Sequence, residues 1–174
     1  MRGGPALSAR GVRLRAARDG DVAFLRALFE TARPDAAFLA AWPEEARRAF
    51  LDQQFGFQSL HYARAYPDAE RLVVLKDGAP IGRIILQRAP AHWCLVDIAL
   101  LPPWRGQGIG TALLQALLAE AAREAAAAVQ LSVDPRNPAR RLYERLGFVA
   151  LDEEPGAASV GMTWRPPPSQ LKTA

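Results

Sequence analysis

Hydrophobic and polar residues alternate from Val12 to Ala17, and after Asp19 the apolar positions change to helical spacing. Alternation with a period of two predicts a strand, and apolar residues three and four positions apart predict a helix, which we expect Asp19 to cap. A second helix is predicted from Pro43 to about Ala65, because proline fits the first helical turn and two glutamates follow it. The N-terminal part of the chain therefore predicts one strand followed by two helices.

Two β-rich stretches, 71–76 and 80–87, lie on either side of the dipeptide Asp77-Gly78. Asp-Gly suits the tight turn of a hairpin, so these stretches are predicted to be antiparallel neighbours. After a short helix predicted over 138–146, the stretches 148–151 and 160–164 predict a final pair of strands.

The almost uninterrupted apolar run 93–101 predicts a strand covered on both faces. An amphipathic helix over about 108–126 and a strand over 129–133 follow it. This order predicts a right-handed βαβ unit with two parallel strands, and hence an α/β protein. The loops after the two strands, 102–110 and 134–137, are expected at the same carboxyl edge of the sheet, where ligands of open α/β sheets bind.

With 174 residues, half of them apolar, the chain is predicted to form a single domain. We expect this domain to span residues 11–165, between a flexible N-terminus, residues 1–10, and a flexible proline-rich tail, residues 166–174. No apolar run is long enough to span a membrane, and the first residues lack the apolar stretch of a secretory signal. A cytoplasmic protein without a membrane partner is therefore expected.

The formal charge is +4, and of the 22 basic residues only Lys76 and Lys172 are lysines. Such a surface attracts phosphates of nucleic acids and of nucleotide-like cofactors alike, but no dense basic block favours a nucleic-acid partner. Cys94 is the single cysteine, which excludes an internal disulfide. The sequence contains only two histidines, His61 and His92, so no zinc site of cysteines and histidines is expected. No other metal is expected either.

The loop that joins the 93–101 strand to the following helix contains Gly106, Gly108 and Gly110. Glycines allow a tight turn and a close approach of ligand to main chain, and unpaired amides at a helix start form an anion site suited to a pyrophosphate. The spacing fits neither the lysine-containing phosphate loop nor the GxGxxG dinucleotide fingerprint. A connector without a ligand is the alternative interpretation.

The segment Arg105-Gly106-Gln107-Gly108-Ile109-Gly110 resembles motif A, R/Q-x-x-G-x-G/A, of the GCN5-related N-acetyltransferases (GNAT family). The segment from Asn137 to Phe148 is similar to the family's N-x-x-A-x-x-L-Y-x-x-x-G-F motif. Two motifs in the expected order are more specific than either alone. The resemblance covers about residues 12–165 and is close over 96–148. It implies a single-domain fold, α/β or α+β by some schemes, with a mixed, mainly antiparallel sheet flanked by helices.

The resemblance implies that the chain transfers the acetyl group of acetyl-coenzyme A directly to a primary amine, without a covalent enzyme intermediate. Main-chain amides from Gln107 to Thr111 would hold the pyrophosphate, with Arg105 beside the phosphates. Asn137 would hydrogen-bond the pantetheine arm, which would pair with main chain near Ala99. The residues assigned to the coenzyme are Ile98, Ala99, Leu100, Arg105, Gly106, Gln107, Gly108, Ile109, Gly110, Thr111, Asn137 and Tyr143.

Two residues are expected to carry the chemistry. The resemblance places the Tyr143 phenol at the thioester sulfur, where a donor stabilises the departing thiolate; a core tyrosine on an amphipathic helix is the alternative. A reacting amine must lose a proton, and Asp97 is the one carboxylate in the strand expected to line the cofactor. Asp97 is therefore the candidate base, directly or through water, and a structural acceptor for an arginine or for main-chain amides is the alternative.

A stripe of uncharged polar side chains follows one face of the second helix at four-residue spacing. It comprises Gln54, Gln58, Tyr62 and Tyr66, of which the first three are the candidate acceptor-binding residues. A half-buried polar helix face is the alternative interpretation. The sequence does not specify whether the amine belongs to a protein, a polyamine, an amino acid, a drug or another metabolite.

Two other classes of function remain open. One is a non-catalytic acyl-coenzyme A sensor or interaction module, and the other is a basic nucleic-acid-binding protein with salt-dependent affinity. Neither explains why both predicted carboxyl-edge loops match one cofactor-binding pattern. Dimers are common among proteins that resemble this chain, so a homodimer is an expected assembly.

Overall fold

The computed structural model describes residues 11–33, 35–89, 92–151 and 156–167. The chain forms two compact units: the first comprises Met1–Ile85 and Asp97–Gln107, and the second comprises Leu86–Val96 and Gly108–Ala174. The segments expected to be flexible, residues 1–10 and 166–174, lie outside the described residues except for Pro166 and Pro167. The domain limits at residues 11 and 165 therefore stay a prediction.

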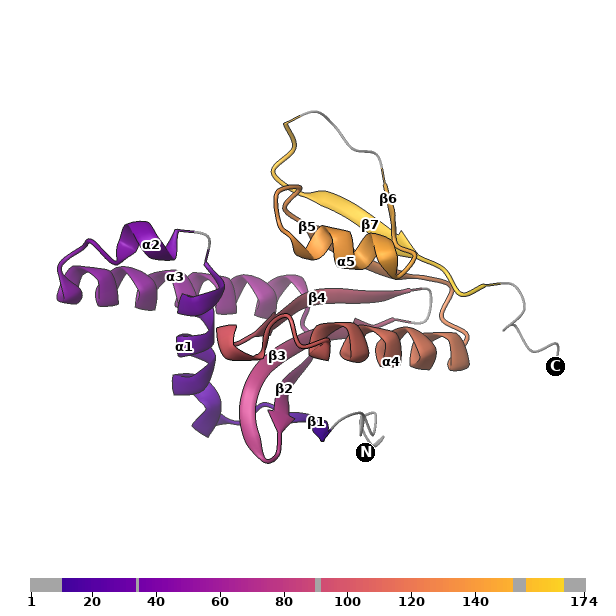
Figure 1. Ribbon diagram of the computed structural model, residues 1–174, viewed down its shortest axis with the longest axis horizontal. Helices are drawn as coiled ribbons and strands as arrows, with labels where there is room; N and C mark the ends of the chain where they lie inside the picture. Colours follow the sequence, from indigo (N-terminus) through magenta and orange to yellow (C-terminus); the bar gives the residue numbers. More distant parts are fainter. Residues whose placement is uncertain (1–10, 34, 90–91, 152–155, 168–174) are drawn as a thin grey trace. The chain divides into compact units, whose positions relative to one another are not determined.

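Apart from the short helix α2, the strands and helices follow the order predicted from the hydrophobic pattern (Figure 1). They are β1 (Val12–Ala16), α1 (Val22–Ala32), α2 (Ala36–Leu39), α3 (Glu44–Ala65), β2 (Glu70–Lys76), β3 (Ala79–Arg88), β4 (Trp93–Leu100), α4 (Ile109–Arg123), β5 (Val129–Val133), α5 (Ala139–Arg145), β6 (Val149–Ala150) and β7 (Val160–Trp164). The strands form one seven-stranded sheet in the order β1-β2-β3-β4-β5-β7-β6. This confirms the α/β fold with a mixed, mainly antiparallel sheet flanked by helices.

In the first unit, β1 and β2 pair in antiparallel register from Val12 opposite Lys76 to Ala16 opposite Leu72. The tight turn between β2 and β3 has φ of 51° at Asp77 and 86° at Gly78. Positive φ at both central residues defines the type I′ turn that matches the twist of a hairpin. The predicted hairpin is confirmed.

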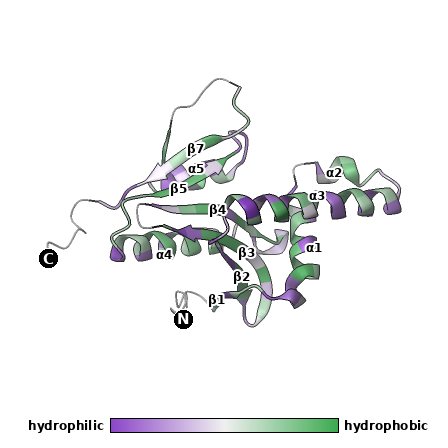
Figure 2. Cartoon of the chain, turned by 180° about the vertical axis from the view of Figure 1, so that it is seen from behind, coloured by the Kyte–Doolittle hydropathy of each residue, from purple (hydrophilic) through white to green (hydrophobic). Residues whose placement is uncertain are grey.

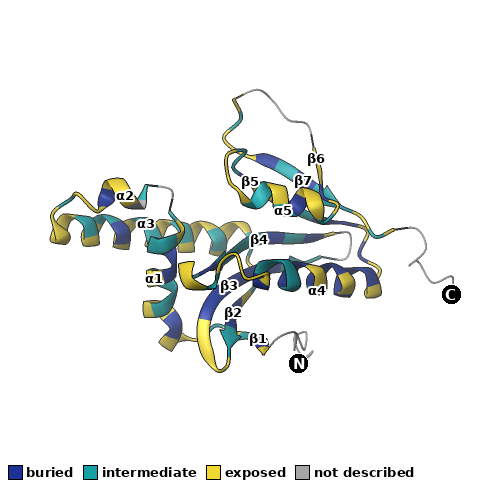
Figure 3. Ribbon diagram, in the orientation of Figure 1, coloured by how far each residue is buried: buried dark blue, intermediate teal, exposed yellow. Residues whose placement is uncertain are grey.

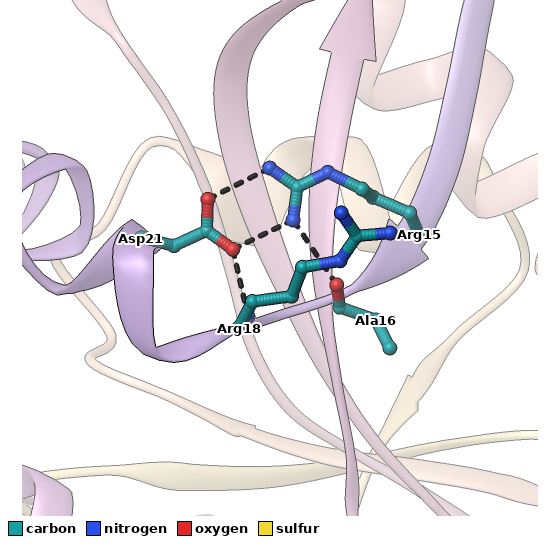
Figure 4. Close-up of polar contacts among 4 residues, drawn as sticks. All are labelled: Arg15, Ala16, Arg18 and Asp21. Atoms are coloured by element: carbon teal, nitrogen blue, oxygen red, sulfur yellow. Dashed lines mark hydrogen bonds and ion pairs between the residues drawn. The ribbon is translucent and has the colours of Figure 1, made fainter.

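Asp21 organises the start of α1 (Figure 4). Its carboxylate accepts two hydrogen bonds from the Arg15 guanidinium, at 2.6 and 2.7 Å, and one from the Arg18 main-chain N–H at 2.8 Å. Residues Asp19–Asp21 form a short 3-10 turn, and α1 begins after it. The prediction that Asp19 caps the helix is therefore wrong, because the residue that flanks α1 is Asp21, two residues further on.

Helices α1, α2 and α3 share an apolar cluster within the first unit. Its buried members are Phe29, Leu39 and Leu51, and Trp42, Phe50 and Phe55 pack against them. The predicted second helix is confirmed as α3, along which exposed turns alternate with half-buried ones (Figure 3). Helix α2 has only four residues, too few to leave a periodic signal in the sequence.

In the second unit, the parallel ladder between β4 and β5 runs from Trp93 opposite Val129 to Leu95 opposite Leu131. Helix α4, largely hydrophobic in Figure 2, connects the two strands and buries one face, comprising Ile109, Leu113, Leu114, Leu117, Leu118 and Ala121. Strand β7 pairs antiparallel with both β5 and β6. The predicted βαβ unit is confirmed.

Strand β4 is less covered than its apolar sequence predicts. Trp93, Leu95 and Leu100 are buried, but the residues from Val96 to Ala99 are only half-buried. The prediction of a strand covered on both faces is therefore wrong for its second half. The β4–β5 ladder does not extend to these residues.

No helix in the described part of the chain is long and apolar enough to cross a membrane. Among the same residues, no three His, Cys, Asp or Glu side chains are grouped so that they could hold a metal ion.

Candidate functional site

The main chain predicted to pair with the pantetheine arm, 98–100, ends β4 in the first unit, where Ile98 and Ala99 are half-buried and Leu100 is buried. The N–H that follows this stretch, that of Leu101, donates to the Ile81 carbonyl at 2.9 Å. Strand β3 approaches so closely that a Cβ on Gly82 would overlap the carbonyl oxygen of Ala99. Glycine at this position therefore fixes the backbone of Ala99 and Leu100 from the β3 side.

Arg105 is engaged with main chain. Its Nε donates to the Leu100 carbonyl at 2.7 Å, and its Nη2 donates to the Thr31 carbonyl at 3.0 Å. Thr31 belongs to the last turn of α1, where carbonyls lack a helical donor. The guanidinium thus ties the loop after β4 to the end of α1, and a contact of Arg105 with phosphate stays a prediction.

The glycine-rich loop has the backbone that the sequence predicts. A 3-10 turn, Pro102–Trp104, follows β4, and the Gln107 amide Nε2 donates to the Pro103 carbonyl at 2.6 Å. Gly106 has φ of 71° and Gly108 has φ of 77°. This left-handed region is readily available only to glycine.

Helix α4 begins directly after this loop, with Gly108 as its N-terminal flanking residue. The first N–H recorded to return to the loop is that of Ala112, which donates to the Gly108 carbonyl at 3.0 Å. The amides of Ile109, Gly110 and Thr111 precede it and have no acceptor inside the helix. With the positive end of the helix dipole, they make a site that fits an anion such as a pyrophosphate.

The second predicted loop, after β5, is held by its own side chains. Asp134 accepts hydrogen bonds from the Arg136 main chain at 2.9 Å and from its guanidinium, and this pairing lowers the pKa of Asp134. The Asn137 side-chain Oδ1 accepts the Ala139 N–H at 2.9 Å, which caps the start of α5. Asn137 itself is exposed, and its amide nitrogen is the group that can donate to a ligand.

Tyr143 lies on α5 and is only 7% exposed. Its ring packs edge-on against Phe148, with centroids 5.8 Å apart. Within the same unit, a Cβ on Gly110 would meet only Leu142 Cδ2, at 3.9 Å, an ordinary contact. The second unit therefore brings the start of α4 next to the helix that carries Tyr143.

Asp97 forms an ion pair with an arginine that the sequence did not single out. Arg83 Nε donates to Asp97 Oδ2 at 2.6 Å, and Arg83 Nη2 donates to Gln58 Oε1 at 2.8 Å. The signal in the sequence was a lone arginine within the apolar strand 80–87, adjacent to a strand with a lone aspartate. Asp97 therefore accepts a hydrogen bond from an arginine, as its alternative structural role requires. The role of Asp97 as base stays a prediction.

Tyr62 completes this cluster. Burial and the nearby negative charge of Asp97 raise the pKa of the Tyr62 phenol, so it stays protonated at neutral pH and can donate a hydrogen bond. Gln54, Gln58 and Tyr62 are half-buried and lie on one face of α3, and Tyr66, also half-buried, directly follows the helix. Of the three candidate acceptor-binding residues, Gln58 binds Arg83, the partner of Asp97, and Tyr62 lies close enough for the charge of Asp97 to affect its pKa. No such interaction is recorded for Gln54 in the part of the chain that the structure describes.

The sequence profile of the Acetyltransferase (GNAT) family matches residues 25–148. This match spans more than half of the chain, which therefore belongs to the GNAT family. Among curated proteins, the chain is 33% identical over 81 residues to the [Ribosomal protein bS18]-alanine N-acetyltransferase of Haemophilus influenzae, covering 47% of this chain and 56% of that protein. It is 32% identical over 92 residues to the L-2,4-diaminobutyric acid acetyltransferase of Nocardia farcinica, covering 51% of this chain and 47% of that protein. The chain thus spans about half the length of these relatives.

Solved structures share the fold at low sequence identity. The PaiA N-acetyltransferase of Thermoplasma acidophilum, in complex with coenzyme A, superposes with a TM-score of 0.66 at 18% identity, covering 88% of this chain and 98% of that one. Arabidopsis thaliana Naa50, in complex with the bisubstrate analogue CoA-Ac-MVNAL, superposes with a TM-score of 0.58 at 17% identity, covering 88% of this chain and 98% of that one. These likenesses support the fold assignment.

Proposed function

We propose that this protein transfers the acetyl group of acetyl-coenzyme A to a primary amine. The observation that carries the proposal is the start of α4, where Gly106 and Gly108 adopt left-handed φ directly before three amides without a helical acceptor. This arrangement fits a pyrophosphate, and it lies in the segment that resembles motif A. Membership of the GNAT family and two curated relatives named as acetyltransferases of amines support the same activity.

Each coenzyme-binding role is assigned to residues of this chain. Main-chain amides from Gln107 to Thr111 bind the pyrophosphate, and Asn137 donates its amide to the pantetheine arm. Main chain of Ile98 to Leu100 pairs with that arm. The fit is supported by the half-buried state of Ile98 and Ala99 and by the exposed position of Asn137.

The bound coenzyme supplies the acetyl group as a thioester. Asp97 takes the proton of the attacking amine, directly or through water, because an amine attacks a carbonyl only with a free lone pair. Tyr143 donates its phenolic hydrogen towards the departing sulfur, which is a better leaving group when a donor stabilises it. Gln58 and Tyr62 line the acceptor side. The hydrogen bond of Gln58 to Arg83 and the influence of the Asp97 charge on the Tyr62 pKa support this assignment.

The proposal also includes a cellular location, the partners and an assembly. We place the activity in the cytoplasm, with acetyl-coenzyme A and an amine as partners and a homodimer as the expected assembly. No nucleic-acid, membrane or metal partner is assigned to it.

The test is a calorimetric titration of the purified protein with acetyl-coenzyme A, followed by an amine screen that records the release of free thiol. Gly110→Glu places bulk and negative charge at the expected pyrophosphate and should abolish binding. Gly110→Ala is the matched control, because a Cβ at this position makes only an ordinary contact with Leu142, and it should fold normally. Tyr143→Phe keeps the ring that packs on Phe148, so it should bind the coenzyme but turn over about ten- to a hundredfold more slowly.

Absence of binding by the folded parent protein would overturn the proposal. Tight binding without turnover of any amine would favour a non-catalytic acyl-coenzyme A sensor instead.

A further inference from the structure

Arg83 is a buried arginine whose hydrogen bonds are divided between two elements. It lies within β3 and is 8% exposed. Its Nε binds Asp97 of β4, whereas its Nη2 binds Gln58 of α3, 25 residues earlier in the chain. All three residues belong to the first unit.

This division is unusual for an arginine beside a carboxylate. Nε and Nη2 lie on one edge of the guanidinium and match the two oxygens of a carboxylate, so they commonly bind both oxygens at once. Here Gln58 Oε1 takes the second donor, and Asp97 receives a hydrogen bond from Arg83 only at Oδ2. No other hydrogen bond to Asp97 is recorded among the residues described, so Oδ1 keeps its capacity to accept one.

We propose that Gln58 and Arg83 are positioning residues for acetyl transfer, an inference that rests on the proposed function. Arg83 fixes the orientation of the Asp97 carboxylate through Oδ2. Gln58 holds the other arm of the guanidinium away from Oδ1, which stays available for the acceptor amine. In the reaction, an N–H bond of the amine breaks and its proton passes to Oδ1, while the nitrogen forms the new bond to the acetyl carbon and the bond from that carbon to sulfur breaks.

The surroundings of this carboxylate agree with such a role. Asp97 is half-buried, with 21% of its side chain exposed, so a small amine can reach it. Tyr62 lies near the same pair, and its phenol stays protonated at neutral pH and can donate a hydrogen bond to the acceptor. The charges of Arg83 and Asp97 compensate each other, so the cluster favours an amine with few positive charges over a polyamine such as spermine.

The test compares Gln58→Leu, Gln58→Glu, Arg83→Met and the double variant Gln58→Leu/Arg83→Met in the full chain. The acceptors are L-2,4-diaminobutyrate, a peptide that begins with alanine, and spermine. We measure kcat, KM for acetyl-coenzyme A and thermal stability. Gln53→Leu and Arg71→Met are matched controls, because both side chains are exposed, the first on α3 and the second on β2.

We expect Gln58→Leu to lower kcat about tenfold, the effect of one lost hydrogen bond, because the freed arm of Arg83 closes on Asp97 Oδ1. KM for acetyl-coenzyme A should not change. Gln58→Glu retains an acceptor for Nη2 and should keep kcat within about threefold of the parent. The double variant should be no slower than Arg83→Met alone, because Gln58 acts through a guanidinium that Arg83→Met already lacks, whereas two independent structural defects would multiply.

Several results would overturn the inference and leave the proposed function intact. These are a parent-like kcat for Gln58→Leu, equal losses for Gln58→Leu and Gln58→Glu, a double variant slowed by the product of the two single effects, and a preference for spermine. A folded parent protein that acetylates none of the three amines would overturn the proposed function and the inference together.

Discussion

The Asp21 carboxylate has a pKa lowered to about 2, chiefly by its hydrogen bonds from the Arg15 guanidinium and also by the Arg18 N–H. A carboxylate with a lowered folded pKa stabilises the fold above its ordinary pKa, near 3.8, and this contribution is lost as the pH falls towards 2. Asp21→Asn removes the charge and keeps the shape of the side chain. We therefore expect the variant to melt at a lower temperature than the parent above about pH 4, with a difference that shrinks between pH 4 and pH 2.

Thermal melts followed by circular dichroism across this pH range check the prediction. Asp19→Asn is the control, because Asp19 is an exposed acid in the same turn and should change the melting temperature little at any pH. A gap between Asp21→Asn and the parent that persists at pH 2 would contradict the assignment.

Residues within short motifs can be predicted from the sequence, whereas residues with distant partners cannot. Tyr143, Asn137 and the glycines could be proposed as site residues because they fall at fixed spacing within short motifs. Arg83 could not, because its partners Gln58 and Asp97 are distant in sequence and only the sheet brings them together. The same holds for Arg105, whose contact with the Thr31 carbonyl spans 74 residues.

At the scale of the elements, β3 lies so close to β4 at Gly82 that there is no room for a side chain. A Cβ there would overlap the carbonyl oxygen of Ala99 and crowd the Cα atom of Leu100, and backbone atoms in a sheet cannot move aside without shifting a strand. Gly82→Ala should therefore destabilise the protein by about 1–3 kcal/mol. Gly56→Ala is the matched control within α3, where no atom lies within 4 Å of the new Cβ, and it should stabilise by about 0.5–1 kcal/mol.

Urea unfolding measures the change in the free energy of unfolding of each variant. The two changes can be compared directly, because both variants replace glycine with alanine. Equal changes in the free energy of unfolding would show that β3 and β4 can separate at this point without loss.

Strong periodicity made most elements predictable. Helices α3 and α4 and the hairpin of β2 and β3 were found because each combines a long pattern with a clear start or turn signal. Helix α2 was missed because four residues carry no period, and the coverage of β4 was overestimated because an apolar sequence does not reveal where a neighbouring strand stops pairing.

At the scale of the whole molecule, the net charge of +4 allows two kinds of anionic partner. A pyrophosphate held by oriented amides at a helix start depends on short-range contacts, whereas duplex DNA bound by surface arginines depends on counterion release. Raising the salt concentration from about 50 to 500 mM should lower the affinity for acetyl-coenzyme A no more than about tenfold. Calorimetry at several salt concentrations, with a random-sequence DNA duplex as the comparison ligand, measures both affinities.

We expect the DNA duplex to show no binding at about 150 mM salt. A steep, salt-dependent affinity for DNA together with no affinity for acetyl-coenzyme A would instead support the nucleic-acid-binding interpretation.

The sequence predicts the fold and the donor side of the proposed reaction in more detail than the acceptor side. The glycine-rich loop is local and carries a motif, whereas the proposed acceptor side depends on how α3 meets β3 and β4. The two curated relatives are named for different acceptors, an alanine of a ribosomal protein and diaminobutyric acid, which agrees with this division.

The hydrogen bond between Gln58 and Arg83 also bears on protein engineering. Exchanging α3 for the corresponding helix of a relative is the obvious way to seek a new amine specificity. A grafted helix without an acceptor at position 58 would, however, release an arginine beside Asp97 and alter the carboxylate that the new substrate must meet. Positions 58, 83 and 97 therefore form one transferable module, and a specificity library should vary them together.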